Sequence, residues 1–205
     1  MDELTKPRNV KTQDTKNKIQ KAATSILKKK GYDYFTVSNI CKAAGVSNGT
    51  FFYHFKTKEE LLTVYNYDEF AKFRKSNGFD QAVADQQWDE KIYTFYYYWC
   101  SYMKEAGLDF ASHYYSTSNT ALDVSRYNQR VPEYTWSFPV LCLNEGKEKG
   151  LLSSEHGVRH YHECLASITK GVCFDWCVSE GARDPLKYLP EVMWPYLKSI
   201  AVGND

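Results

Sequence analysis

The chain has 205 residues and a net charge of only +1, from 26 basic and 25 acidic side chains. This length is sufficient for one large domain, or for a small and a larger domain that each bury a core. No run of about 18 apolar residues is present, which excludes a membrane-spanning helix, and the polar N-terminal segment lacks the apolar core of a secretion signal, so we expect a cytoplasmic protein.

The charge is unevenly distributed along the chain. Residues 1–76 carry 15 basic and 8 acidic side chains, whereas residues 77–205 carry 11 basic and 17 acidic side chains. A basic first third followed by an acidic remainder favours contact with phosphates. A solvated lysine-rich helix would give the same composition, so the charge alone leaves both interpretations open.

The first predicted helix follows a polar segment, residues 1–13, that we expect to be a loose tail. Asp14 or Thr15 is expected to cap the helix, and Gly31 to end it. Its apolar residues recur at helical spacing and predict one buried face. They are Ile19, Ala22, Ala23, Ile26 and Leu27.

Two short helices joined by a tight turn are predicted between Thr36 and Phe55. Thr36 and Ser47 each precede a helix, where a hydroxyl can accept from free backbone N–H groups. Gly45 supplies the backbone freedom that the turn requires. Phe51 and Phe55 are four residues apart and share the face that we assign to the core. This is the layout of a helix-turn-helix, whose second helix enters the major groove of DNA.

The next helix begins with a predicted capping box, Thr57 to Glu60, in which the two side chains bond each other's backbone N–H groups. Lys58 lies in the first turn, where the helix dipole opposes a cation and favours a phosphate. We therefore predict a phosphate partner for Lys58, the alternative being a merely exposed lysine.

Three segments within residues 16 to 65 resemble the DNA-binding domain of the TetR family of bacterial transcriptional repressors. They are T-V-x-x-I-x-x-A-A-G-V-S, N-G-T-F-F-Y-H-F and K-T-K-E-E-L-L. The resemblance implies an all-α protein of about nine helices, in which a three-helix helix-turn-helix domain precedes a larger helical domain for ligand binding and dimerisation. It also implies that the protein is not an enzyme. In one departure, Phe52 stands where the family usually has a tyrosine that touches a phosphate.

The layout and the resemblance together assign DNA-binding roles. Thr36, Tyr53, His54 and Lys58 are predicted to hold phosphates, which set the register of a protein on DNA. Asn48, Gly49 and Thr50 are predicted to lie nearest the base edges, and Gly49 would permit close approach because it has no side chain. The full predicted set is Thr36, Ser47, Asn48, Gly49, Thr50, Phe52, Tyr53, His54 and Lys58.

Asn77-Gly78 interrupts the helical pattern, so we expect a DNA-binding domain over residues 1–76 and a helical domain over residues 77–205. The segment from Trp88 to Met103 is apolar almost all round, which predicts a helix in the middle of a helical body. Further helices are predicted over residues 110–115, 132–149, 157–179 and 185 onward, the last of them capped by Asp184.

Three residues in the later helices have predicted structural consequences. Gly171 lies inside a helix, where we expect another helix to pack close to it. Pro190 and Pro195 lie inside the last segment, where each removes a backbone bond, so this helix is expected to kink or restart. The last two long helices are expected to form the face of a homodimer.

The resemblance implies a pocket for a small molecule in the second domain, and its aromatic side chains are consistent with one. Planar side chains with polar tips form the walls of apolar pockets, although each residue could equally pack in the core. The candidates are Tyr96, Trp99, Tyr102, Met103, Tyr115 and Trp136. We therefore predict a dimer that binds a palindromic operator on double-stranded DNA and is released by an apolar or aromatic effector.

Two other classes of protein stay open. His156, His160, His162 and Cys164 lie close in sequence, so a zinc-responsive regulator using residues 156–177 is the alternative. The six cysteines show no disulfide spacing, and buried reduced thiols are the simpler interpretation. An enzyme would need a recognisable motif, but no phosphate loop, G-x-S-x-G or H-E-x-x-H is present, and no cofactor is expected.

Overall fold

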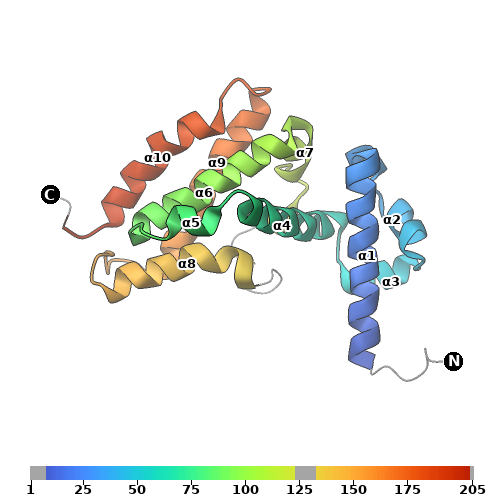
Figure 1. The fold of residues 1–205 in the computed structure, drawn as a ribbon. Coiled ribbons are helices and arrows are strands. Elements are labelled where there is room, and N and C mark those ends of the chain that lie inside the picture. The colour runs from blue at the N-terminus through green and yellow to red at the C-terminus, as the bar shows by residue number, and fades with distance from the viewer. Residues whose placement is uncertain (1–7, 123–132, 204–205) are drawn as a thin grey trace. The chain divides into compact units, whose positions relative to one another are not determined.

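The structure, a computed structural model, describes residues 8–122 and 133–203 (Figure 1). In these two ranges the chain forms ten α-helices and two short 3-10 helices, and its only pairing of extended residues is an isolated antiparallel bridge between Leu152 and Ala201. The predicted all-α class is therefore confirmed. The described ranges contain one helix more than expected, because the residues after Gly78 form a short helix, Phe79–Val83 (α5).

The chain divides into two compact units, which we describe separately. The first comprises residues 1–66 with residues 118–120, and the second comprises residues 67–117 with residues 121–205. The helix Lys58–Ser76 (α4) contributes residues to both units. The predicted domain boundary at residue 76 stays a prediction.

The first unit is built on α1, which packs against the helix-turn-helix. Its elements are α1 (Arg8–Lys30), a 3-10 helix (Tyr32–Tyr34), α2 (Val37–Ala44), α3 (Asn48–His54) and the start of α4. The residues that meet in its core come from the four α-helices and from the positions just after the 3-10 helix and α3, and all are at most 1% exposed. They include Ile19, Ala23, Phe35, Ile40, Phe51, Phe55 and Leu61.

Helix α1 begins at Arg8, so the predicted cap at Asp14 or Thr15 is wrong. Thr15 lies inside the helix, where its hydroxyl donates to the carbonyl of Lys11 at 2.9 Å, one turn earlier. A threonine hydroxyl can bond a carbonyl within a helix as well as a free N–H at its start, and the local sequence does not separate the two. Residues 1–7 of the predicted tail lie outside the described residues.

The second unit is organised around α6 (Trp88–Ala106), which packs against all the other complete α-helices described in this unit (Figure 1). They are α5, α7 (Leu108–Tyr114), α8 (Glu133–Glu148), α9 (Val158–Val178) and α10 (Pro185–Ile200). Ile92, Phe95, Tyr96, Cys100 and Met103 of α6 are completely buried. The predicted position of this helix in the middle of the body is confirmed.

Helix α10 is continuous from Pro185 to Ile200, so the helix does not restart at Pro190. Asp184 caps it as predicted, accepting from the N–H of Leu186 at 3.0 Å. The apolar side chains that α10 buries recur every three or four residues and favour one unbroken helix over the cost of two lost backbone bonds. They are Leu189, Met193, Leu197 and Ile200.

The glycine at a close helix contact is Gly146, and the prediction for Gly171 is wrong. A Cβ added to Gly171 would meet nothing within 4 Å. A Cβ added to Gly146 in α8 would lie 2.7 Å from Cδ2 of Trp88 in α6. The indole of Trp88 therefore packs directly on the backbone of α8.

Replacing Gly146 by alanine is expected to lower the free energy of unfolding by about 1–3 kcal/mol, because the buried Trp88 ring must shift. Gly49→Ala is the matched control, since its Cβ would lie 3.7 Å from the Ser47 hydroxyl and meet nothing closer. That variant should gain about 0.4–1 kcal/mol, because alanine loses less backbone entropy on folding. Urea unfolding measures both changes, and a Gly146→Ala protein as stable as wild type would contradict the close contact.

Candidate functional site

The turn between α2 and α3 is fixed by two caps and one glycine. Thr36 Oγ1 accepts from the N–H of Asn39 at 3.2 Å, and Ser47 Oγ accepts from the N–H of Thr50 at 3.1 Å. Gly45 adopts φ 67° and ψ 38°, a left-handed conformation that only glycine adopts at no steric cost. The predicted caps and turn are confirmed, so the orientation of α3 is set by local bonds.

Helix α3 is anchored by one face and exposed on the rest. Phe51 is fully buried and Phe55 is 1% exposed, with ring centroids 5.9 Å apart. Phe52 and Tyr53 are 47% and 70% exposed, large fractions for aromatic side chains. A seven-residue helix with two aromatic anchors presents its remaining side chains on a rigid support.

Most of the residues that the sequence predicted to contact DNA are accessible. Thr36, Ser47, Asn48, Gly49, Phe52 and Tyr53 are exposed, and Thr50, His54 and Lys58 are half-buried. The structure brings all of them except Thr36 and Lys58 onto α3 or its cap. Their contacts with DNA stay a prediction.

Lys58 is held against the protein in this structure. Its Nζ lies 4.7 Å from the ring centroid of Tyr32 and 3.8 Å from Oε1 of Glu59. Tyr32 was missed by sequence reasoning, because it belongs to the 3-10 helix after α1 and no local spacing links it to Lys58. The aromatic ring and the carboxylate keep the ammonium group at the start of α4.

The capping box at α4 differs from the predicted one in one bond. Thr57 Oγ1 accepts from the N–H of Glu60 at 3.1 Å, as expected. The carboxylate of Glu60 accepts from the N–H of Lys56 at 2.7 Å instead of from Thr57. This bond still satisfies a free backbone N–H between α3 and α4, and so orders the short connection.

His54 lies near the ammonium group of Lys16. Partial burial lowers the pKa of His54, and the charge of Lys16 lowers it further. Lys16 comes from α1 and also lies 5.8 Å from the ring centroid of Phe55. Neutral His54 can donate to a phosphate from one ring nitrogen, and a nearby phosphate would favour its protonation.

The effector candidates lie in the core of the second unit. Tyr96, Trp99, Tyr102, Met103 and Tyr115 are all at most 7% exposed, and the side chain of Trp136 lies outside the described residues. Trp99 Nε1 donates to the hydroxyl of Tyr115 at 2.7 Å. Burial raises the pKa of Tyr115 well above its ordinary value, so this hydroxyl stays protonated. The structure therefore gathers five of the six candidates around α6 and joins two of them by a hydrogen bond.

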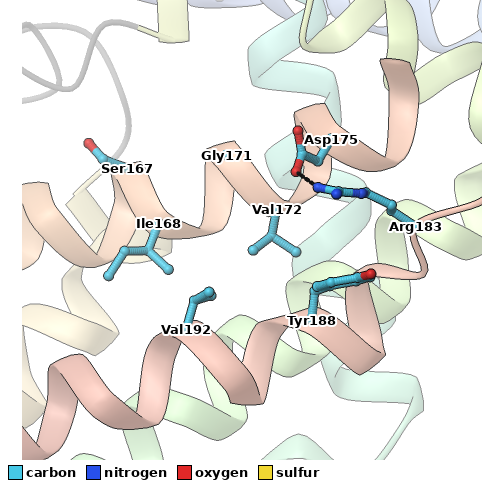
Figure 2. A pocket seen from close by; sticks show the side chains of 8 residues that line it. All are labelled: Ser167, Ile168, Gly171, Val172, Asp175, Arg183, Tyr188 and Val192. Atoms are coloured by element: carbon cyan, nitrogen blue, oxygen red, sulfur yellow. Dashed lines mark hydrogen bonds and ion pairs between the residues drawn. The ribbon is translucent and has the colours of Figure 1, made fainter. Parts of the chain in front are cut away.

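A separate groove lies between α9 and α10 (Figure 2). It has a volume of about 360 Å³, and the ion pair between Arg183 Nη1 and Asp175 Oδ2, 2.8 Å long, lies at one end. None of the effector candidates lines it. The lining residues are Ser167, Ile168, Gly171, Val172, Asp175, Arg183, Tyr188 and Val192.

The histidines considered for zinc do not form a complete metal site. His156 and His160 have ring centroids 4.2 Å apart, and Cys164 Sγ lies 3.7 Å from His160 Nε2. His162 is only 7% exposed, and burial lowers its pKa to about 4. Among the described residues no group of three or more His, Cys, Asp or Glu side chains could hold a metal ion. The geometry therefore gives no support to the zinc-responsive alternative.

No helix in the described ranges is long and apolar enough to cross a membrane.

Comparisons with known proteins agree with this arrangement. Residues 19–64 match the family model described as bacterial regulatory proteins, tetR family. The chain is 32% identical over 113 residues to the transcriptional regulator QacR of Staphylococcus aureus, a match that covers 51% of this chain and 57% of QacR. The chain thus matches little more than half the length of that relative.

Solved structures with the same fold cover almost the whole chain. FadR from Bacillus subtilis in complex with stearoyl-CoA has a TM-score of 0.58 at 21% identity, covering 90% of this chain and 98% of FadR. RolR in complex with resorcinol has a TM-score of 0.63 at 16% identity, covering 94% of this chain and 90% of RolR. At these identities the likeness concerns the fold, which comprises an N-terminal helix-turn-helix and a larger helical domain.

Proposed function

We propose that the protein is a ligand-responsive transcriptional repressor of the TetR family of bacterial regulatory proteins, whose family model matches residues 19–64, and that it acts in the cytoplasm. It binds a palindromic operator on double-stranded DNA as a homodimer, without enzymatic activity. The observation that carries the proposal is the exposed surface of α3, held by Phe51 and Phe55 and oriented by capped turns. A helix supported in this way fits the major groove.

Phosphate contacts flank the helix in this proposal. Lys58 and His54 supply charge or hydrogen bonds, and the exposed Tyr53 and Thr36 supply hydroxyls. Lys58 changes partner on binding, because a phosphate at the start of α4 is favoured by the helix dipole and by the ammonium group together. The stacking on Tyr32 holds the ammonium close to that position beforehand.

The second copy of the chain covers α9 and α10. Phe174, Val178, Tyr188 and Val192 are large apolar side chains on these two helices with between 39% and 61% of their surface exposed. Tyr188 and Val192 also line the groove between the two helices, which is open above Gly171, where a Cβ would meet nothing within 4 Å. Exposed apolar side chains in and beside a groove can pack against the same face of a second copy under a two-fold rotation, which suits an isologous dimer.

The effector enters the second unit near the aromatic cluster of α6. FadR is in complex with stearoyl-CoA and RolR with resorcinol, so proteins of this fold bind ligands that contain an apolar chain or an aromatic ring. In this chain the hydrogen-bonded pair Trp99 and Tyr115 offers hydrogen-bonding groups among apolar side chains. Binding shifts the dimer toward a conformation in which the spacing of the two α3 helices does not match the operator.

Lys58→Ala is expected to weaken binding to every DNA duplex alike and to flatten the dependence of the binding constant on salt. Loss of one phosphate contact from each protomer should reduce the slope by about 2 for the dimer. Lys75→Ala, at the exposed end of the same helix and in the other unit, is the control. Fluorescence anisotropy between low and moderate salt measures the slopes, and an unchanged slope for Lys58→Ala would rule out its phosphate contact.

Val178→Glu is expected to convert the dimer to a monomer, because it places a charge on the apolar face of α9. Leu141→Glu is the matched control, since Leu141 on α8 is 62% exposed and Val178 is 61% exposed. Sedimentation equilibrium gives the association state of each variant. A dimeric Val178→Glu protein, or equal dissociation of both variants, would contradict the proposed face.

Apolar and aromatic compounds that raise the melting temperature of the protein are expected to release it from DNA. A ligand at a hundred times its dissociation constant stabilises the folded state by about 2.7 kcal/mol, which a thermal-shift assay detects readily. Tyr115→Phe, which retains the ring and removes the hydroxyl, should weaken binding of those hits that contain a polar group. If compounds that stabilise the protein leave its DNA affinity unchanged, the protein is a DNA-binding dimer without effector control.

A further inference from the structure

The exposed face of α3, which we define as Asn48, Gly49, Phe52 and Tyr53, has an unusual composition for a DNA-reading surface. The helix Asn48–His54 contains no Arg, Lys, Gln, Asp or Glu. Its side chains on this face are one amide and two aromatic rings, beside a glycine. The base pairs that such a surface can recognise are therefore restricted by chemistry.

Asn48 is available for contacts outside the protein. It is exposed, and its side chain makes no hydrogen bond with the part of the chain that the structure describes. The neighbouring hydroxyls are engaged with each other, since Ser47 Oγ lies 2.9 Å from Thr50 Oγ1 and also caps the N–H of Thr50. Gly49 adds no side chain, so bases can approach Asn48 without obstruction.

Phe52 is exposed but not freely mobile. Its ring packs edge-on against the buried Phe51, with centroids 5.3 Å apart and an interplanar angle of 86°. The side chain of Phe52 is nevertheless 47% exposed to solvent. A held, half-exposed ring without a hydroxyl can make apolar contacts, and it has no group to bond a phosphate.

Asn48 and Phe52 stand one helical turn apart on adjoining parts of this face, because they are four residues apart. Four residues advance about 6 Å along the helix, which corresponds to about two base-pair steps of roughly 3.4 Å. Their two contacts should therefore fall within about two base pairs of each other.

Each residue matches one edge of an A·T pair in the major groove. The amide of asparagine can accept from adenine N6 and donate to adenine N7, and an apolar ring can contact the C5-methyl group of thymine. Guanine presents two acceptors, which favour Arg or Lys, and cytosine presents a donor, which favours Glu or Asp. All four of these residue types are missing from α3.

We propose that α3 reads A·T base pairs, with Asn48 on an adenine and Phe52 on the methyl group of a thymine within about two base pairs of it. The proposal rests on the proposed DNA-binding function and adds the chemical class of the operator. Phosphate contacts from Lys58 and its neighbours provide affinity, and these two residues provide the sequence preference.

The first experiment selects bound duplexes from a random library with the full-length wild-type protein. The expected result is a two-fold-symmetric site whose half-sites contain an adenine and a thymine at most about two base pairs apart. Half-sites in which every selected contact position is G·C would overturn the proposal. Failure to bind any duplex at low salt would instead contradict the proposed function itself.

The second experiment replaces each thymine of the selected site by deoxyuridine, which removes only the methyl group. Wild-type affinity should fall about fourfold for each half-site at one position, the amount expected for one buried methyl group. Phe52→Ala should bind the thymine and uridine duplexes equally, whereas Phe52→Tyr, which retains the ring, should keep the discrimination. Wild-type protein that does not distinguish the two duplexes would overturn the role of Phe52.

The corresponding test for Asn48 replaces each adenine by 7-deazaadenine, which lacks the N7 acceptor. Wild-type affinity should fall about fivefold to tenfold at one adenine in each half-site, in the range of one lost hydrogen bond. Asn48→Ala should be insensitive to the same replacement. Equal sensitivity of the two proteins would show that another group contacts that adenine.

Discussion

The burial of the apolar side chains of α6 is the constraint on which the second unit depends. A helix that carries Ile92, Phe95, Tyr96 and Met103 completely buried cannot lie free at a surface, so other helices must pack around it. The enclosure is tight enough that α8 approaches Trp88 at a position where only glycine fits. Such packing transmits small displacements between helices, because close-packed interiors shift between discrete arrangements and do not deform continuously.

In the first unit, by contrast, a short and mostly exposed helix must be held in place. Helix α3 has only seven residues, too few to be stable alone, and the proposed contact with DNA requires most of its surface to be free. Two buried rings and a capped start hold it instead, and the bonds of Ser47 and Glu60 order the chain on either side. The result is a short, rigid support whose exposed side chains are free for an external partner.

Two surfaces thus remain unpartnered in the two units, the exposed face of α3 and the groove of α9 and α10. In the proposed dimer these surfaces have linked roles, because a two-fold axis at the groove repeats α3 at a fixed spacing along DNA. In the proposed mechanism an effector in the second unit changes operator occupancy by binding one dimer conformation more tightly than the other. The hydrogen-bonded pair Trp99 and Tyr115 is the buried polar contact that we propose for this effector.

The sequence by itself determined the features that depend on neighbouring residues. The caps at Thr36, Ser47 and Asp184, the turn at Gly45 and the central position of α6 all follow from local spacing and residue type. Periodicity is a property of a few consecutive turns, so it can be recognised without knowing the fold. The helix-turn-helix could therefore be predicted almost completely.

Only the tertiary structure decided which residues meet from distant parts of the chain. It showed that Gly146, and not Gly171, accommodates a neighbouring helix, and that Tyr32 holds Lys58. It also separated the aromatic cluster around α6 from the groove between α9 and α10, and it kept α10 unbroken through Pro190. Each of these outcomes depends on packing between helices that are far apart in the sequence. A local sequence pattern carries no information about which distant helix will pack against it.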